Sequence, residues 1–243
     1  MNQKLDNSFG NETVSPEERQ QRIRTLFDDV AGRYDLMNDI MSFGIHRLWK
    51  RRFVRGLPEQ GLFLDLAGGT GDVAALVARE PGRQVVVCDP SVEMMRVGKA
   101  NQDKGAITWV SGEGERLPFA DGTVTALTVA FGLRNVTHLD QALAEAHRVL
   151  APGGRFACLE FSRPIAGFRP LYDLYSYLVI PRLGAWVAGE PAAYQYLVES
   201  IRRFPPQKEF AAQLEHAGFT KVNYRNLSLG IACIHSGTRG AAS

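Results

Sequence analysis

The sequence lacks the features that mark secreted, membrane-spanning or nucleic-acid-binding chains. Its three cysteines, Cys88, Cys158 and Cys233, are far apart and each lies within an apolar run. Such isolated cysteines favour buried thiols in a reducing compartment over disulfides or zinc ligands. The 28 basic and 26 acidic residues give a net charge of +2, which is too close to neutral to predict nucleic acid as a partner.

Long hydrophobic runs are also missing. No stretch approaches the roughly 18 apolar residues that a membrane-spanning helix needs, and the polar N-terminus has no secretory signal. We therefore expect a cytoplasmic protein. Residues 1–14 are typical of a disordered arm, and we expect residues 15–243 to form a single domain, because 243 residues suit one sizeable core.

The chain contains short apolar runs that alternate with segments of helical spacing. This alternation predicts an α/β fold with a largely parallel sheet. Helices are predicted from Ser15 towards Val30 and over residues 46–57, 91–100, 137–150 and 207–217, and a helical insert over residues 164–206. The expected strands, the last two forming an antiparallel hairpin across Leu227-Ser228, are residues 62–66, 85–89, 107–110, 123–129, 155–161, 220–226 and 229–235.

A glycine-rich turn follows the first predicted strand. Glycines let the backbone approach a bound molecule, and the free N–H groups at the start of the next helix favour an anion. Gly69, Gly71 and Ala74 fit the dinucleotide pattern G-x-G-x-x-A, with Asp89 about 20 residues further on. Against NAD, the chain has no Tyr-x-x-x-Lys pair and ends in helix, strand, strand, without a second mononucleotide-binding half.

The same turn also fits S-adenosylmethionine (SAM). An acid, a small residue and Gly-x-Gly are present as Asp65, Ala67, Gly69 and Gly71. Asp65 is placed to hold the ammonium group of the ligand, and Asp89 can accept hydrogen bonds from both ribose hydroxyls, each contributing about 1.5–3 kcal/mol. Glu113 and Gly114, after the third strand, are where the adenine edge would be recognised.

The chain closely resembles the ubiquinone/menaquinone biosynthesis C-methyltransferase family from about residue 26 to 235. The resemblance rests on YDLMNDIMSFGIH (34–46), LDLAGGTGD (64–72), FGLRNV (131–136), RVLAPGG (148–154) with LEFS (159–162), and YQYLVESI (194–201). It implies a class I SAM-dependent methyltransferase: a Rossmann-like, mostly parallel seven-stranded sheet with an antiparallel C-terminal hairpin, N-terminal helices and a helical insert. Thr70 and Ala130 join the expected cofactor positions.

The implied reaction is methylation of a ring carbon of a polyprenylated benzoquinol or naphthoquinol, with no metal. A ring hydroxyl must first lose its proton, and a phenol-like pKa of about 10 makes the anion rare at neutral pH. Arg134 and Asn135, just past the fourth strand, are the predicted catalytic residues, because ligands bind at the carboxyl ends of parallel strands. The alternative is that Arg134 pairs with a carboxylate and holds the loop.

We interpret residues 15–57 as a helical lid, with Tyr34, Asp35 and His46 as candidate substrate residues, although packing alone explains Tyr34 and His46 equally well. The insert is expected over the substrate side, where residues 168–186 suit a prenyl tail or a helical core. The helix over 46–57 has Trp49, Phe53 and Leu57 on one face and arginines opposite, with Lys50 on a flank; its basic face suits solvent or a peripheral membrane contact.

Three other hypotheses remain open from the sequence. The enzyme could methylate another lipid-like or small acceptor, the chain could be a non-catalytic cofactor-binding subunit of a biosynthetic complex, or it could be an NAD-binding reductase. Other quinone-biosynthesis enzymes are conceivable partners, and the sequence does not predict the oligomeric state.

Overall fold

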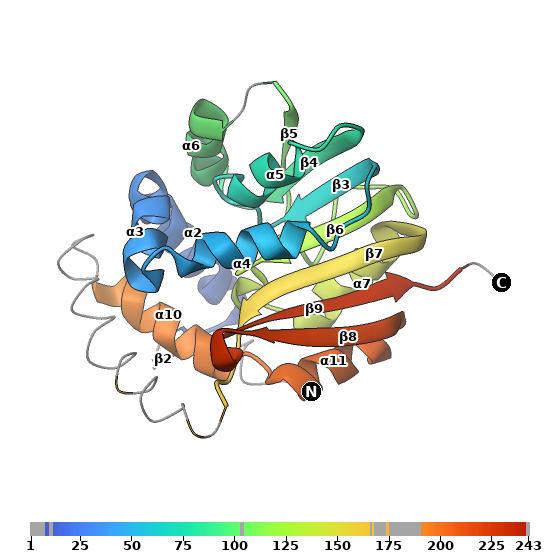
Figure 1. The fold of residues 1–243 in the computed structure, drawn as a ribbon. Helices are drawn as coiled ribbons and strands as arrows, with labels where there is room; N and C mark the ends of the chain where they lie inside the picture. Colours follow the sequence, from blue (N-terminus) through green and yellow to red (C-terminus); the bar gives the residue numbers. More distant parts are fainter. Residues whose placement is uncertain are drawn as a thin grey trace.

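The alternating apolar runs form one seven-stranded sheet (Figure 1). The computed structural model describes residues 8–9, 12–102, 105–165, 167, 174 and 191–241, and the statements below concern these residues. The strand order is β5-β4-β3-β6-β7-β9-β8. The strands are β3 (Gly61–Leu66), β4 (Arg83–Asp89), β5 (Ile107–Ser111), β6 (Val124–Ala130), β7 (Leu150–Phe161), β8 (Phe219–Leu227) and β9 (Ala232–Arg239).

The strands from β5 to β7 are parallel, whereas β9 runs antiparallel to both β7 and β8. This arrangement confirms the predicted fold class. Parallel strands need crossover connections, and the helices that supply them cover both faces of the sheet (Figure 1). The helices are α2 (Pro16–Val30), α3 (Tyr34–Ser42), α4 (Ile45–Val54), α5 (Asp72–Val77), α6 (Val92–Gln102), α7 (Leu139–Val149), α10 (Pro191–Arg203) and α11 (Gln207–His216).

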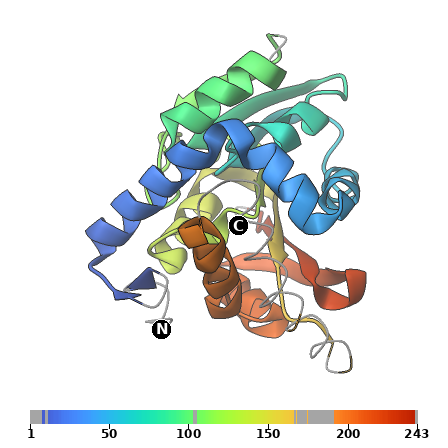
Figure 2. The ribbon, with the colours of Figure 1, turned by 90° about the vertical axis from the view of Figure 1, so that its left-hand side faces the viewer.

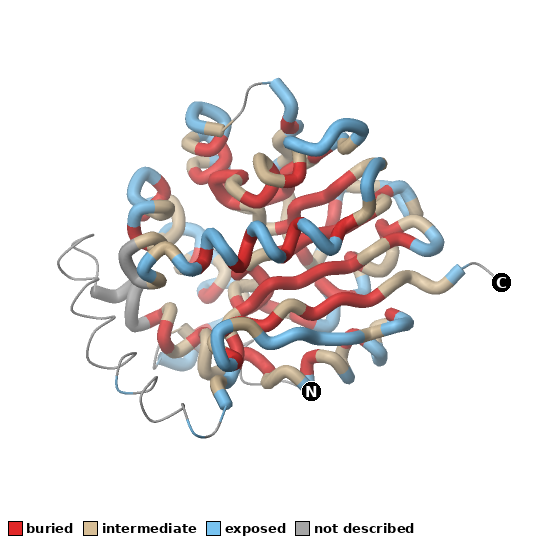
Figure 3. The backbone as a smooth tube through the Cα atoms, viewed as in Figure 1, coloured by how far each residue is buried: buried red, intermediate tan, exposed pale blue. Residues whose placement is uncertain are grey.

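Each face of the sheet has its own hydrophobic core, because successive side chains of a strand point to opposite faces. Phe63 and Val87 pack with Trp49 and Phe53 of α4 on one face. On the other face, residues including Leu64 pack with α7 and α11. Figure 3 shows the central strands buried along most of their length and β8 exposed at the sheet edge.

The structure corrects two predicted element boundaries. Strand β7 begins at Leu150 rather than near residue 155, because Leu150 already pairs with Val124 before the register shifts past the Pro-Gly-Gly bend. The link between β8 and β9 spans residues 228–231 rather than Leu227-Ser228. Ser228 and Leu229 have φ of 46° and 58°, and this left-handed backbone ends the strand despite its apolar sequence.

Several helices gather at the carboxyl ends of the parallel strands. Figure 2 looks onto this edge, with the N-terminal helices in blue on one side and α10 in orange on the other. Nearby, Ser8–Phe9 pairs with Glu12–Thr13 in a short antiparallel ribbon that the sequence does not predict. Phe9 stacks on Tyr196 of α10 at a centroid distance of 5.0 Å. Residues 1–7 and most of residues 166–190, where the prenyl-tail passage is expected, lie outside the described residues.

Candidate active site

The glycine turn joins β3 to α5 through three residues with left-handed backbone. Ala67, Gly69 and Gly71 have φ of 50°, 53° and 73°. Gly71 precedes α5 directly, and a Cβ there would lie 2.5 Å from the Trp109 ring. The position therefore requires glycine for both its backbone angle and its close packing.

Asp65 lies directly beneath this turn and is 1% exposed. Its Oδ1 accepts a hydrogen bond from Thr128 Oγ1 at 2.8 Å, whereas its Oδ2 has no hydrogen-bond partner among the described residues. Burial raises the pKa of Asp65 to about 7. A buried carboxylate oxygen without a donor is costly unless a ligand supplies one, so Asp65 is suited to a ligand that carries N–H donors and positive charge.

Asp89 ties the end of β4 to the same turn. Its Oδ2 accepts from the Gly69 N–H at 2.8 Å, and its Oδ1 accepts from the Ser91 N–H at 2.8 Å. Burial raises the pKa of Asp89 to about 6, although these two N–H donors oppose the shift. Each carboxylate oxygen has a second lone pair, and because Asp89 lines the main pocket it can accept two hydroxyl donors there.

The main pocket contains about 810 Å³ of empty space, which includes solvent at its open mouth. Seven of the predicted site residues line it: Tyr34, Ala67, Gly69, Asp89, Glu113, Gly114 and Asn135. The residues that line it do not include Asp65, Thr70, Gly71, Ala130, Arg134, Asp35 or His46. Helix α2 belongs to the predicted lid, but the sequence did not single out the pocket residues that it contributes: Gln20, Ile23, Arg24 and Phe27.

Glu113, the residue expected at the adenine edge, pairs with α2 across the pocket. Its Oε1 lies 2.9 Å from Arg24 Nη2. Both side chains also line a shallow polar groove beside the main pocket. The N-terminal helix therefore covers the part of the pocket where β4 and β5 end.

Arg134 lies behind the pocket and is 4% exposed. Its Nη1 donates to the Phe131 carbonyl and lies 3.2 Å from both carboxylate oxygens of Glu160. Burial raises the pKa of Glu160, opposed by the Arg134 charge. This pairing is the alternative that the sequence left open for Arg134. The guanidinium is not fully used, however, because its Nε has no partner among the described residues.

Asn135 faces the pocket and is held from two sides. Its Oδ1 accepts a hydrogen bond from Tyr196 Oη at 3.1 Å. Its backbone carbonyl accepts from Arg19 Nη1 at 3.1 Å. Arg19, a residue that no local pattern marks as special, is 1% exposed and also donates to the carbonyls of Arg134 and Val136. A single guanidinium of α2 thus fixes the loop that carries both predicted catalytic residues.

The N-terminal block contacts the glycine turn directly. Asp35 Oδ1 accepts from Thr70 Oγ1 at 3.0 Å, and burial raises the pKa of Asp35. His46 is buried, its Nδ1 lies 2.7 Å from Ser42 Oγ, and burial lowers its pKa. The structure therefore brings Asp35 to the glycine turn, whereas His46 of α4 contacts Ser42 and Asp39 of α3.

Lys50, which helical spacing places on a flank of α4, is buried in the structure. Lys50 is 5% exposed, and its ammonium pairs with Asp72, the first residue of α5. A helical wheel shows only that Lys50 borders the apolar face; it cannot show that an acidic partner from another element lies there. Arg51, Arg52 and Arg55 are exposed as predicted.

The sheet is parallel except for its terminal antiparallel strand pair. A glycine turn follows β3, and buried acids lie at the ends of β3 and β4. These features together define a class I SAM-dependent methyltransferase. Solved structures share the fold at low identity. A SAM-dependent methyltransferase from Thermotoga maritima covers 89% of this chain and 99% of its own, with a TM-score of 0.65 and 18% identity. The [4+2]-cyclase SpnF covers 92% and 97%, with a TM-score of 0.66 and 15% identity. These similarities establish the fold alone.

Residues 15–239 match the ubiE/COQ5 methyltransferase family, and the chain belongs to this family. The ubiquinone/menaquinone biosynthesis C-methyltransferase UbiE of Rubrivivax gelatinosus is 60% identical over 98% of this chain and 95% of its own length. The mitochondrial 2-methoxy-6-polyprenyl-1,4-benzoquinol methylase of Homo sapiens is 47% identical over 94% and 83%. The chain is a SAM-dependent C-methyltransferase of ubiquinone/menaquinone biosynthesis.

Two further observations concern the described residues only. They contain no group of three or more His, Cys, Asp and Glu side chains arranged to hold a metal ion. Within the same part of the chain, no helix combines the length and apolarity needed to cross a membrane.

Proposed function

We propose that the chain binds SAM in the main pocket and methylates a ring carbon of a polyprenylated quinol. The observation that carries the proposal is the pair of buried acids at the turn: Asp65, whose Oδ2 has no hydrogen-bond partner among the described residues, and Asp89, which lines the pocket. An ammonium group and two vicinal hydroxyls match these acceptors. The named relatives support the quinol as acceptor, since one is a benzoquinol methylase and another serves both quinone pathways.

In this proposal the remaining cofactor residues act through shape and hydrogen bonds. Ala67, Gly69, Thr70 and Gly71 hold the methionine end at the turn, and Ala130 closes it at the end of β6. Glu113 and Gly114 recognise the adenine edge, with Ile23 and Phe27 of α2 covering the ring. When bound, SAM supplies an electrophilic methyl group.

Arg134 and Asn135 are proposed to act on the acceptor. Arg134 stabilises the phenolate oxygen or orients a water that takes the hydroxyl proton, using the part of its guanidinium that Glu160 leaves unoccupied. Preorganised donors of this kind contribute about 10²–10³ in rate. Asn135, held by Tyr196 and Arg19, places its amide beside the ring, while Tyr34, Asp35 and His46 belong to the lid formed by residues 15–57.

The proposal also includes a cytoplasmic location with peripheral membrane contact. The exposed arginines of α4 lie beside exposed apolar side chains, among them Phe43 and Leu48, which are 74% and 62% exposed. Cationic side chains at an anionic leaflet contribute about 1 kcal/mol each. Such a contact would bring the active site close to acceptors whose prenyl tails lie in the membrane, and to other enzymes of quinone biosynthesis.

The test is a methyl-transfer assay with purified protein, labelled SAM and matched benzoquinol and naphthoquinol acceptors of equal tail length. We expect labelled product from at least one acceptor, and the ratio of kcat/KM values gives the ring preference. Label on an amine or sterol acceptor but on neither quinol would favour a different methyltransferase. SAM binding without turnover on any acceptor would favour a non-catalytic subunit.

A further inference from the structure

Two polar contacts join the N-terminal helices to the glycine turn, one on each side of Gly71. On one side, Thr70 Oγ1 donates to Asp35 of α3 at 3.0 Å. On the other side, Asp72 pairs with the ammonium of Lys50 from α4. Gly71 itself has φ of 73° and offers no side chain to cap α5. The turn is therefore held by side chains from α3 and α4 as well as by its own backbone.

Lys50 stays charged despite its burial. Only 6% of its side chain is exposed, against 28% for Asp72. Burial lowers the pKa of Lys50, but the nearby carboxylates, Asp72 above all, more than offset this effect, so that its pKa is raised overall. An ammonium group is thus fixed in the protein interior beside the residues of the turn.

The same ammonium lies next to the opposite wall of the pocket. Lys50 Nζ is 5.9 Å from the ring centroid of Phe131, which follows β6 and lines the pocket. Trp49, the preceding residue, lies 6.4 Å from Phe131 and 6.3 Å from Phe161 between ring centroids. Helix α4 therefore connects the start of α5 with the ends of β6 and β7, the two sides between which a methyl donor and its acceptor must meet.

Stability alone does not account for this pair. Removing two charges from water costs about as much as their attraction returns, and well-packed neutral side chains of similar volume are often equally stable. An ion pair with one member fully buried is instead suited to fixing geometry, because displacement of either partner leaves a charge uncompensated.

We propose that Lys50 is a positioning residue for methyl transfer: through Asp72 it fixes the glycine turn relative to the Phe131 wall. The inference rests on the proposed function, since the turn is taken to hold the methionine end of SAM. Asp89 and the adenine wall supply most of the affinity in that arrangement. Loss of Lys50 should therefore lower kcat much more than it raises the KM for SAM.

The test compares Lys50→Met, Asp72→Asn and the double variant with Arg51→Met, a change at the next residue of the same helix. The assay uses labelled SAM and a benzoquinol with a single isoprenoid unit, which needs no membrane. Lys50→Met leaves Asp72 unpaired and should lower thermal stability, whereas the double variant should regain it. In the double variant and in Asp72→Asn we expect kcat to fall by about 10–100-fold, since small misplacements have effects of this size, with the KM for SAM within about threefold of wild type.

Amide hydrogen exchange supplies a readout that does not depend on turnover. Exchange over residues 67–73 should be faster in the double variant and in Asp72→Asn than in Arg51→Met. Exchange in the strands of the sheet should be the same in all of these variants. A double variant with wild-type kcat, or with unchanged exchange in the turn, would overturn the role of Lys50. A wild-type protein that methylates no quinol would refute the proposed function instead, and the exchange data would still test the positioning.

Discussion

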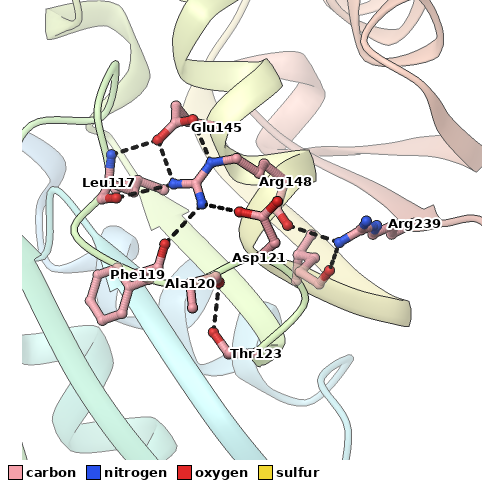
Figure 4. Close-up of polar contacts among 9 residues, drawn as sticks. Leu117, Phe119, Ala120, Asp121, Thr123, Glu145, Arg148 and Arg239 are labelled. Atoms are coloured by element: carbon pink, nitrogen blue, oxygen red, sulfur yellow. Dashed lines mark hydrogen bonds and ion pairs between the residues drawn. The ribbon is translucent and has the colours of Figure 1, made fainter.

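Two arginines from the sequence blocks that carry the family resemblance have different surroundings in this molecule. Arg148 lies at the end of α7, and Figure 4 shows all three of its guanidinium nitrogens engaged. It binds Glu145, Asp121 and the carbonyls of Leu117 and Phe119. Arg134 lies deeper, uses Nη1 for Glu160 and the Phe131 carbonyl, and leaves Nε without a partner among the described residues.

The difference distinguishes a residue that supports the fold, which we call the frame, from a residue of the candidate site. Arg148 joins α7 to the segment before β6, and its own carbonyl accepts from Arg239 of β9 at 2.8 Å (Figure 4). Every donor is satisfied, so nothing remains for a ligand. Arg134 is only partly satisfied and lies at the carboxyl end of β6, where ligands of parallel sheets bind. We therefore expect Arg148 to act mainly in stability, whereas the role in chemistry is proposed for Arg134.

The largest expected effect comes from Arg134→Ala. We expect kcat to fall by about 10²–10³, while SAM affinity measured by calorimetry stays close to wild type, because Arg134 does not line the cofactor pocket. Glu160→Gln serves as the control for loss of the buried pair. If Arg134→Ala turns over at a near-normal rate, Arg134 belongs to the frame and the contrast with Arg148 disappears.

Arg148→Ala should lower stability rather than kcat. Loss of its charge-assisted hydrogen bonds should lower the free energy of unfolding by about 2–3 kcal/mol, or the Tm by about 5–10 °C. The kcat of the folded fraction should stay within about twofold of wild type. Thermal unfolding and assays at low temperature measure both quantities. A large loss of kcat in a variant of normal stability would mean that Arg148 acts on the site.

The sequence predicts the parts of the site that depend on local order. The turn at residues 65–71 and Asp89 follow from strands that end in glycines or an acid, and the parallel sheet then brings them together. Arg19 and Lys50 could not be found in this way. Both lie in amphipathic helices among other charged residues, and only the tertiary structure shows that they are buried against the 134–137 loop and Asp72.

Lowering the pH should affect the stability of the fold and the affinity for SAM differently, and these effects should be smaller than those of the substitutions. Arg148 lowers the pKa of Glu145, so the stability from this pair is present above the unfolded pKa of about 4.3 and is lost only in stronger acid. The pKa values of Asp65 and Asp89 are raised by burial to about 7 and about 6. SAM affinity should therefore fall several-fold between pH 8 and pH 5.5, while the fold persists.

The raised pKa of Asp65 also predicts an effect on stability. Its protonated form is favoured in the folded protein, so the contribution is present below the unfolded pKa of about 3.9 and is lost as the pH rises through about 7. Asp65→Asn should raise the Tm of the ligand-free protein at pH 8 by a few degrees and weaken SAM binding. Calorimetry and thermal unfolding at pH 6 and pH 8 measure both effects, and a variant with wild-type SAM affinity would contradict the role given to Asp65.

The most direct test of the account is to identify the bond that forms. Purified protein is incubated with SAM carrying a ¹³C-labelled methyl group and a short-tailed quinol, and the product is examined by NMR. We expect a labelled methyl on a ring carbon, with both ring hydroxyls retained, and loss of this signal in Arg134→Ala but not in Arg148→Ala. Label on a ring oxygen, or no labelled quinol at all, would contradict C-methylation of a quinol.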